Sequence, residues 1–175
     1  MIAGHRLPTT ASLIAAVGLA LTVVGVRGVA AEPLNPSFRA VAGGAQMVPE
    51  VATATHARVR VSFNRDLSEA SFSLRVRAGT AITAAHLHCA PAGENGPIVL
   101  PLFEPESPGV DLDGPAASGL VTAADLLPTA GDPCGLTINN LASLKAAMRA
   151  GRVYLAVHSE TEPAGVVRGQ LVAFD

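Results

Sequence analysis

Two histidines and a cysteine lie close together in residues 85–97, namely His86, His88 and Cys89. Imidazole nitrogens bind copper and zinc, and they do so best when several of them are held on a rigid surface. Side chains two positions apart on a strand point to the same side of the sheet, so a strand here places His86 and His88 together. A later strand that carries His158 can bring a third imidazole to that face. The sequence therefore predicts a mononuclear copper or zinc site formed by these three histidines, with redox activity as an added option.

The same histidines also fit a polar network that holds no metal. Arg168 and Gln170 share one face of a predicted strand near the end of the chain. Glu160 or Glu162 would then supply the carboxylate that pairs with the guanidinium. In this second interpretation the imidazoles are structural residues held by hydrogen bonds. Both interpretations use the same strands, so the choice between them stays open at this point.

Residues 1–31 have the composition of a secretory signal peptide. His5 and Arg6 precede an uncharged, mostly apolar run from Ala11 to Val26, and small residues fit a cleavage site after Ala31. The apolar run is shorter than the roughly 20 residues that cross a bilayer comfortably. We therefore expect cleavage and a secreted or periplasmic protein. An uncleaved segment would act as a membrane anchor, which is the one membrane contact that the sequence suggests.

Cleavage leaves a chain the size of one domain. Of 175 residues 144 remain, with 32–36 as a lead-in and 37–175 as the folded domain. Without the two arginines of the signal segment, ten basic residues face fourteen acidic residues, a formal charge of −4. This balance argues against a general nucleic-acid binder. In an oxidising compartment the two cysteines, Cys89 and Cys134, are expected to form one disulfide.

An arginine-rich hairpin is the clearest secondary-structure signal in the chain. From Ala57 to Arg77, apolar and polar residues alternate on both sides of a polar turn at 64–66, which is typical of half-buried antiparallel strands. The turn places Arg58 near Arg75, and like charges opposite each other are unfavourable. Nearby carboxylates would neutralise this face, and without them it would bind an anion. The candidate residues of this anion face are Arg58, Arg60, Arg75 and Arg77.

The rest of the chain predicts short strands and one helix. Apolar runs between Gly and Pro turns predict strands at 38–42, 81–89, 98–103, 152–158 and 165–173. Residues 104–119 are rich in Pro, Gly and Asp and are expected to form a loop. A helix is expected at 140–150, where Leu141, Leu144 and Met148 share a face. One helix among many strands predicts an all-β fold, an antiparallel, Greek-key-like β-sandwich or barrel.

The order of several short motifs resembles the CHRD domain, a family named from the extracellular protein chordin and widespread in bacterial exported proteins. In chain order the motifs are Gly44-Ala-Gln46-Met-Val-Pro49, His86-Leu-His88, Asn95-Gly-Pro97, Gly151-Arg-Val-Tyr154 with His158, and Arg168-Gly-Gln170. The chain departs from the family pattern at Met47, Glu50 and His56, away from the other histidines. The resemblance extends over 37–173 and implies an all-β extracellular domain of a bacterial exported protein, without established catalysis.

The sequence favours a binding or structural module over an enzyme. It contains no Gly-x-Ser-x-Gly elbow, no phosphate-binding loop and no His-Glu-x-x-His motif. We therefore expect the domain to bind an extracellular protein or matrix component whose identity the sequence does not specify. The mononuclear copper or zinc protein is the first alternative, and the anion-binding arginine face is the second.

Overall fold

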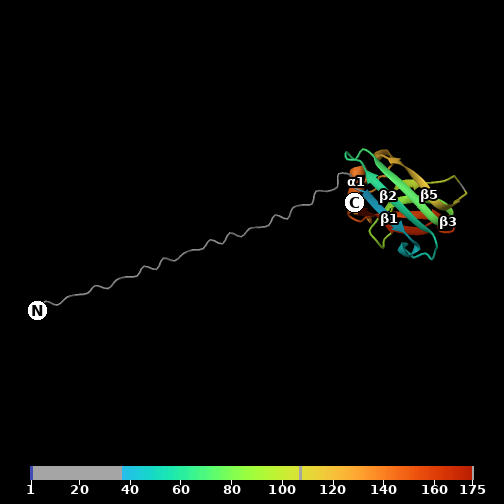
Figure 1. The fold of residues 1–175 in the computed structure, drawn as a ribbon, viewed down its shortest axis with the longest axis horizontal. Helices are drawn as coiled ribbons and strands as arrows, with labels where there is room; N and C mark the ends of the chain where they lie inside the picture. Colours follow the sequence, from blue (N-terminus) through green and yellow to red (C-terminus); the bar gives the residue numbers. More distant parts are fainter. Residues whose placement is uncertain (2–36, 107, 175) are drawn as a thin grey trace. The chain divides into compact units, whose positions relative to one another are not determined.

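The fold is a nearly closed, barrel-like antiparallel sheet with one short helix (Figure 1). The computed structural model describes residues 1, 37–106 and 108–174. In chain order the strands are β1 (Ser37–Ala42), β2 (His56–Phe63), β3 (Ala70–Cys89), β4 (Ile98–Phe103), β5 (Val110–Val121), β6 (Val153–Ser159), β7 (Val167–Gln170) and β8 (Val172–Phe174). The other elements are η1 (Gly44–Gln46), η2 (Ala123–Asp125) and α1 (Leu141–Arg149). The predicted all-β antiparallel fold with one helix near 140–150 is confirmed.

The order of the strands brings the two ends of the sheet together. Hydrogen-bonded neighbours follow the order β7-β6-β3-β2-β1-β8, and β4 and β5 also pair with β3. Gly43, directly after β1, forms an antiparallel bridge with Arg168 of β7. β1 therefore meets both the last strand and β7, so the apolar faces of the strands enclose a common core.

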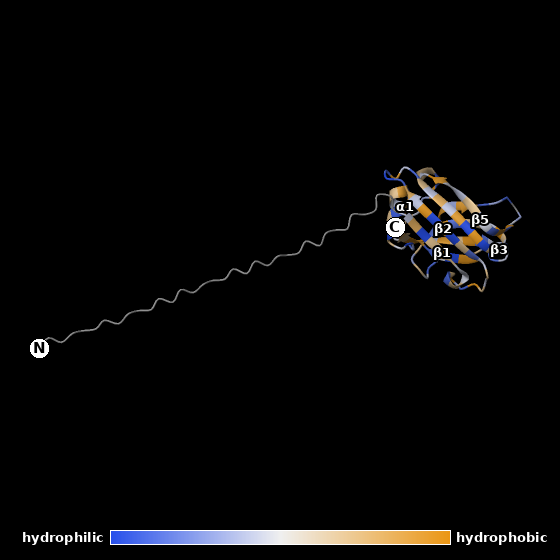
Figure 2. Ribbon diagram, in the orientation of Figure 1, coloured by the Kyte–Doolittle hydropathy of each residue, from blue (hydrophilic) through white to orange (hydrophobic). Residues whose placement is uncertain are grey.

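Alternating burial separates a core face from a solvent face along the strands. In β2, Val59 and Val61 are buried, whereas Arg58 and Arg60 are exposed. Figure 2 shows the same alternation of hydrophilic and hydrophobic residues along β1, β2 and β3. The hairpin prediction is confirmed in its register, because Arg58 of β2 lies opposite Arg75 of β3.

β3 is the strand to which most of the sheet is attached. Its first half pairs with β2 and β5, and its second half pairs with β4 and β6. Between the halves, Ala78 and Ala81 have positive φ angles of 48° and 47°, and the register with β5 shifts. The sequence predicts separate strands at 70–77 and 81–89. The structure joins them, because β5 pairs with residues on both sides of these bulges.

The loop expected at 104–119 is wrong from Val110 onward, where β5 begins. Its polar residues take part in the pairing instead of preventing it. Asp111 Oδ1 accepts a hydrogen bond from the Ala81 backbone N–H at 2.8 Å, so the carboxylate satisfies a donor that the irregular part of β3 exposes. Pro115 lies opposite Arg75 at a register shift, where a missing backbone donor is tolerated.

The helix and the disulfide form as predicted. Asn140 caps α1 by accepting a hydrogen bond from the Ser143 backbone N–H at 2.8 Å. Leu144 and Met148 pack into the core from the buried face of α1. Cys89, the last residue of β3, is bonded to Cys134 in the segment before α1, and both are fully buried.

The predicted signal peptide, residues 1–31, and the lead-in, residues 32–36, lie outside the described residues, apart from Met1. Of the helices that the structure does describe, none has both the length and the hydropathy needed to cross a bilayer.

Candidate metal site

The three histidines lie together on the face of β3 and β6 that points away from the core. His86 and His88 of β3 lie opposite Ala156 and Tyr154 of β6, and His158 lies opposite Ala84. Opposed residues in a sheet share a face, so the three imidazoles and the Tyr154 ring point to the same side. Their strand neighbours, such as Leu87, belong to the core on the other side.

A covering segment, residues 90–97, shields this outward face from solvent. The Gly96 carbonyl oxygen lies 2.9 Å from His88 Nδ1, and the Gly96 backbone N–H donates to the Tyr154 hydroxyl at 3.0 Å. Asn95 donates from Nδ2 to the Val48 carbonyl oxygen at 2.7 Å and ties the segment to the η1 side of the fold. His86 and His88 are consequently only 7% and 9% exposed.

The three imidazoles converge on a common point. The ring centroids of His86 and His158 lie 5.1 Å apart, those of His88 and His158 5.6 Å, and those of His86 and His88 5.9 Å. One ring nitrogen from each residue lies within 4.8 Å of those of the other two. The His158 ring is partly exposed, but its Nε2 atom is shielded from solvent. The predicted three-histidine cluster is therefore present in the structure.

Each histidine uses one ring nitrogen for an outer hydrogen bond and leaves the other without a partner. His88 Nδ1 and His158 Nδ1 lie 2.9 Å and 3.0 Å from the carbonyl oxygens of Gly96 and Pro163. A carbonyl only accepts, so both Nδ1 atoms carry the proton and both Nε2 atoms present a lone pair in the neutral ring. His88 Nε2 and His158 Nε2 are buried without a hydrogen-bond partner.

The third imidazole is oriented by a carboxylate. His86 Nε2 lies 3.0 Å from Glu104 Oε1, and His86 Nδ1 is buried without a partner. An ionised carboxylate accepts a hydrogen bond from Nε2–H, so the Nδ1 lone pair of the neutral ring is free. Histidines that bind metals generally donate their other N–H to a carboxylate or carbonyl in this way. The three unpartnered nitrogens are thus a group that could hold a metal ion.

Burial keeps His88 and His158 in the protonation state that binds metals. Desolvation lowers the pKa of His88 to about 4, against the opposing effect of its bond to Gly96, and the neighbouring His158 and His86 lower it further. Desolvation also lowers the pKa of His158, with a contribution from His86. Both rings are therefore neutral at pH 7, with their lone pairs available.

The lowered pKa of His88 predicts acid destabilisation of the metal-free protein. The unfolded chain takes up this proton near the ordinary pKa of about 6.5, whereas the native state resists it down to about 4. Stability from His88 is thus present above about pH 6.5 and is lost as the pH falls. We expect the free energy of unfolding to drop by about 2 kcal/mol between pH 7 and 5. Urea titrations at several pH values measure this drop.

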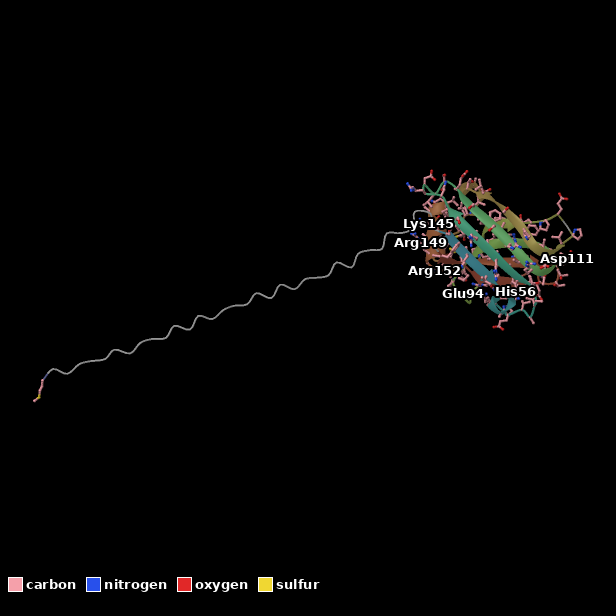
Figure 3. All side chains as sticks on the ribbon, viewed as in Figure 1. His56, Glu94, Asp111, Lys145, Arg149 and Arg152 are labelled. Carbon is pink, nitrogen blue, oxygen red and sulfur yellow. A yellow bond between two sulfur atoms is a disulfide. The ribbon has the colours of Figure 1, made fainter. Side chains whose placement is uncertain are left out.

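The matched control for the pH effect is an exposed histidine. His88→Gln is expected to flatten the dependence between pH 7 and 5. His56→Gln, which replaces an exposed histidine of β2, serves as the comparison variant. Figure 3 shows His56 on the ribbon. Equal slopes in the wild type and in His88→Gln would contradict the assignment.

Arg168 and Gln170 belong to the same face and hold the covering segment in place. Arg168 is only 2% exposed, and its guanidinium lies 3.7 Å above the Tyr154 ring. It donates to the Glu94 carbonyl oxygen at 2.7 Å and to the Pro91 carbonyl oxygen at 2.8 Å. Gln170 accepts from Arg168 at 3.3 Å. These two residues are hydrogen-bonded to each other and to the backbone, with carbonyl oxygens as the principal acceptors.

The carboxylate partner expected for Arg168 lies elsewhere. Glu160 Oε1 accepts a hydrogen bond from the Gly109 backbone N–H at 2.9 Å. Glu162 takes part in the turn after β6, where its backbone N–H donates to Ser159 Oγ at 3.1 Å. In the described part of the chain no ion pair joins either glutamate to Arg168. The carbonyl oxygens of the covering segment accept the hydrogen bonds of the Arg168 guanidinium, which is the role expected for a carboxylate.

Two residues of the site are missing from the sequence prediction. Tyr154 stacks on His88 with ring centroids 5.1 Å apart and planes 16° from parallel. Its position four residues before His158 on one strand places both on one face, so the spacing contains this signal. Glu104 contacts His86 only because it follows β4, which pairs with β3 through a shifted register. No local pattern reveals that pairing.

Comparison with known proteins gives one match. The family model of the CHRD domain matches residues 38–171, which is most of the chain. No curated protein and no solved structure matches it. The match spans β1 to β7 and includes all three histidines and both cysteines. The chain therefore belongs to the CHRD domain family.

Proposed function

We propose that this CHRD domain is an exported binding module that holds one copper or zinc ion through His86, His88 and His158. The observation that carries the proposal is the convergence of three buried ring nitrogens, each without a hydrogen-bond partner. An unpaired buried polar atom costs free energy, and three of them at one point are difficult to account for in a purely structural network. A metal ion satisfies all three together.

The distances allow such an ion after a small movement of the rings. Copper and zinc bind imidazole nitrogen at about 2.0–2.1 Å, so tetrahedral geometry needs the nitrogens roughly 3.3 Å apart. The present upper limit of 4.8 Å therefore requires the rings to approach one another. His158 makes this movement most easily, because its ring is partly exposed.

The donor set favours a borderline transition metal. All three donors are imidazoles, and the two cysteines are joined in a disulfide and provide no thiolate. Imidazole suits both copper and zinc, and Cu²⁺ binds more tightly than Zn²⁺ to a given nitrogen site. Copper would add one-electron redox activity to the domain, whereas zinc would serve as a structural or ligand-binding centre.

The disulfide supports export of the domain. Cys89 and Cys134 are fully buried and bonded to each other. Such bonds persist in oxidising compartments and are rare where thiols are kept reduced. We therefore place the protein in a secreted or periplasmic setting, in agreement with the signal-like composition of residues 1–31.

The test is metal stoichiometry in matched variants. Purified protein is stripped with a chelator, incubated with Cu²⁺ or Zn²⁺, passed through a desalting column and analysed for metal. The wild type is expected to retain about one equivalent of the preferred ion. His158→Ala is expected to lose it, because two imidazoles hold a divalent ion much more weakly than three. His56→Ala should retain it, because His56 is exposed on β2, outside the cluster.

The Tm with and without metal distinguishes loss of metal binding from misfolding of the variant. An ion that binds only the native state adds about 2.7 kcal/mol at one hundred times its Kd, so it raises the Tm of the wild type. His158→Ala should fold in the absence of metal and show no such rise. Retention below about 0.1 equivalent by folded wild-type protein would rule out a resident ion and leave the hydrogen-bonded network as the role of the histidines.

A further inference from the structure

We propose that a second site, the arginine groove, binds an anionic polysaccharide. A groove of about 700 Å³ lies over the solvent face of β1, β2 and β3. Four arginines line it, one from β1, two from β2 and one from β3: Arg39, Arg58, Arg60 and Arg75. Its position on the first half of β3 separates it from the histidines on the second half.

The pairing of the strands places these positive charges directly opposite one another. Arg39 lies opposite Arg60, and Arg58 lies opposite Arg75. Like charges in such positions destabilise a sheet. The two pairs occupy successive outward positions, about 7 Å apart along the strands. An anion that binds between two adjacent pairs of this kind would reduce their repulsion and stabilise the sheet.

Among residues 37–106 and 108–174, no carboxylate forms an ion pair with an arginine of the groove. The adjacent Arg77, in contrast, is paired with Asp113 at 3.3 Å. The groove therefore differs from the predicted anion face at one position, with Arg39 in place of Arg77. Arg39 and Arg60 lie 5.4 Å and 4.6 Å from the centre of the Phe174 ring, which orients them without reducing their charge.

The form of the groove identifies the class of ligand. Two pairs of guanidinium groups in separate rows match a ligand with repeated negative charges better than a single small anion. Guanidinium groups bind sulfate and carboxylate oxygens through paired hydrogen bonds. Exposed Val41 and Val172 also line the groove and offer apolar contact for the sugar rings between the charges. A sulfated or carboxylated polysaccharide has all of these features.

The overall charge of the protein does not oppose this assignment. The chain has a formal net charge of −2, so a general attraction to anions is absent and binding must come from the local cluster. Binding is therefore expected to weaken steeply with added salt, because the exposed guanidinium groups are screened.

The experiment compares polysaccharides and charge-matched variants in the presence of a chelator, so that metal bridging is excluded. Metal-free full-length protein is titrated with dextran sulfate, with polygalacturonate and with neutral dextran at low ionic strength. We expect binding to one or both anionic chains and none to dextran. Tighter binding of dextran sulfate identifies sulfate as the preferred group, and tighter binding of polygalacturonate identifies carboxylate.

The variants assign the binding to the groove. Arg58→Gln/Arg75→Gln removes one opposed pair and is expected to weaken binding about tenfold or more. Arg65→Gln/Lys145→Gln makes the same change in net charge on the hairpin turn and on α1, away from the groove, and should alter binding less than about twofold. Figure 3 shows Lys145 on α1, apart from His56 at the start of β2.

A folding control accompanies the binding data. Removing like charges from an exposed face is expected to leave the Tm of Arg58→Gln/Arg75→Gln unchanged or higher. Weaker binding by a variant with an intact Tm therefore reports the lost contacts. Failure of the wild type to bind either anionic chain, or an equal loss in the two double variants, overturns the proposal.

Discussion

Replacing Cys89 and Cys134 together by alanine is expected to lower the free energy of unfolding by about 4 kcal/mol. The disulfide links residues 45 positions apart in the sequence, so it removes a large amount of conformational entropy from the unfolded chain. Both cysteines are fully buried, so the substitution also loses packing in the core. Urea denaturation of the variant and of the wild type, followed by far-UV circular dichroism, measures the difference.

Reduced wild-type protein is the natural control for the double variant. It lacks the covalent link but keeps both sulfurs, so it should lose nearly as much stability as Cys89→Ala/Cys134→Ala. A common loss below about 1 kcal/mol would contradict the expectation and would show that the unfolded chain is already compact near this link. The measurement therefore tests how far the bond acts through the unfolded state.

Arg168→Met is expected to destabilise the protein by about 3 kcal/mol, the second large effect. The substitution preserves much of the buried volume but removes the donors to Glu94 and Pro91 and the contact with Tyr154. The two carbonyl oxygens then lose charged donors in a shielded place, which costs more than the bonds themselves contributed. Urea denaturation near pH 7 measures this loss.

Two comparisons show whether the effect comes from the covering segment. Arg75→Met changes an exposed arginine and is expected to shift stability by less than about 0.5 kcal/mol. Arg168→Lys should recover little, because an ammonium does not reproduce a planar group that reaches two carbonyls and stacks on an aromatic ring. Hydrogen exchange of the Gly96 amide should accelerate in Arg168→Met. Unchanged exchange together with wild-type stability would show that the segment is held by other contacts.

Local patterns were sufficient to predict most strands and the histidine cluster. Alternation from Ala57 to Arg77 and the turn at 64–66 set the register that places Arg58 opposite Arg75. The two-residue spacing of His86 and His88 placed them on one face, because side-chain direction in a strand depends only on position. These properties are carried by neighbours in the sequence, so a single chain reveals them.

The features that were missed depend on contacts between distant segments. β5 contains Pro, Gly and Asp, and it pairs because Asp111 satisfies a backbone donor at the bulge of β3. Arg168 is partnered by carbonyl oxygens of residues 91 and 94, and backbone carbonyls have no signature in a sequence. Glu104 reaches His86 through a shifted register between β3 and β4. Such partners follow from the assembled sheet and not from the local composition.

An irregularity in β3 changes which residues of the strand point into the core. Up to residue 82 the core residues of β3 have even numbers, as with Leu74, Val76 and Ile82, and from residue 85 onward they have odd numbers, as with Leu87 and Cys89. The change of parity coincides with the register shift between residues 82 and 84 in the pairing with β6. An unbroken pleat would turn both even-numbered histidines of β3 into the core and the leucine between them outward. The histidines of the candidate metal site therefore face outward because the pairing of β3 with β6 contains one extra residue between Ile82 and Ala84.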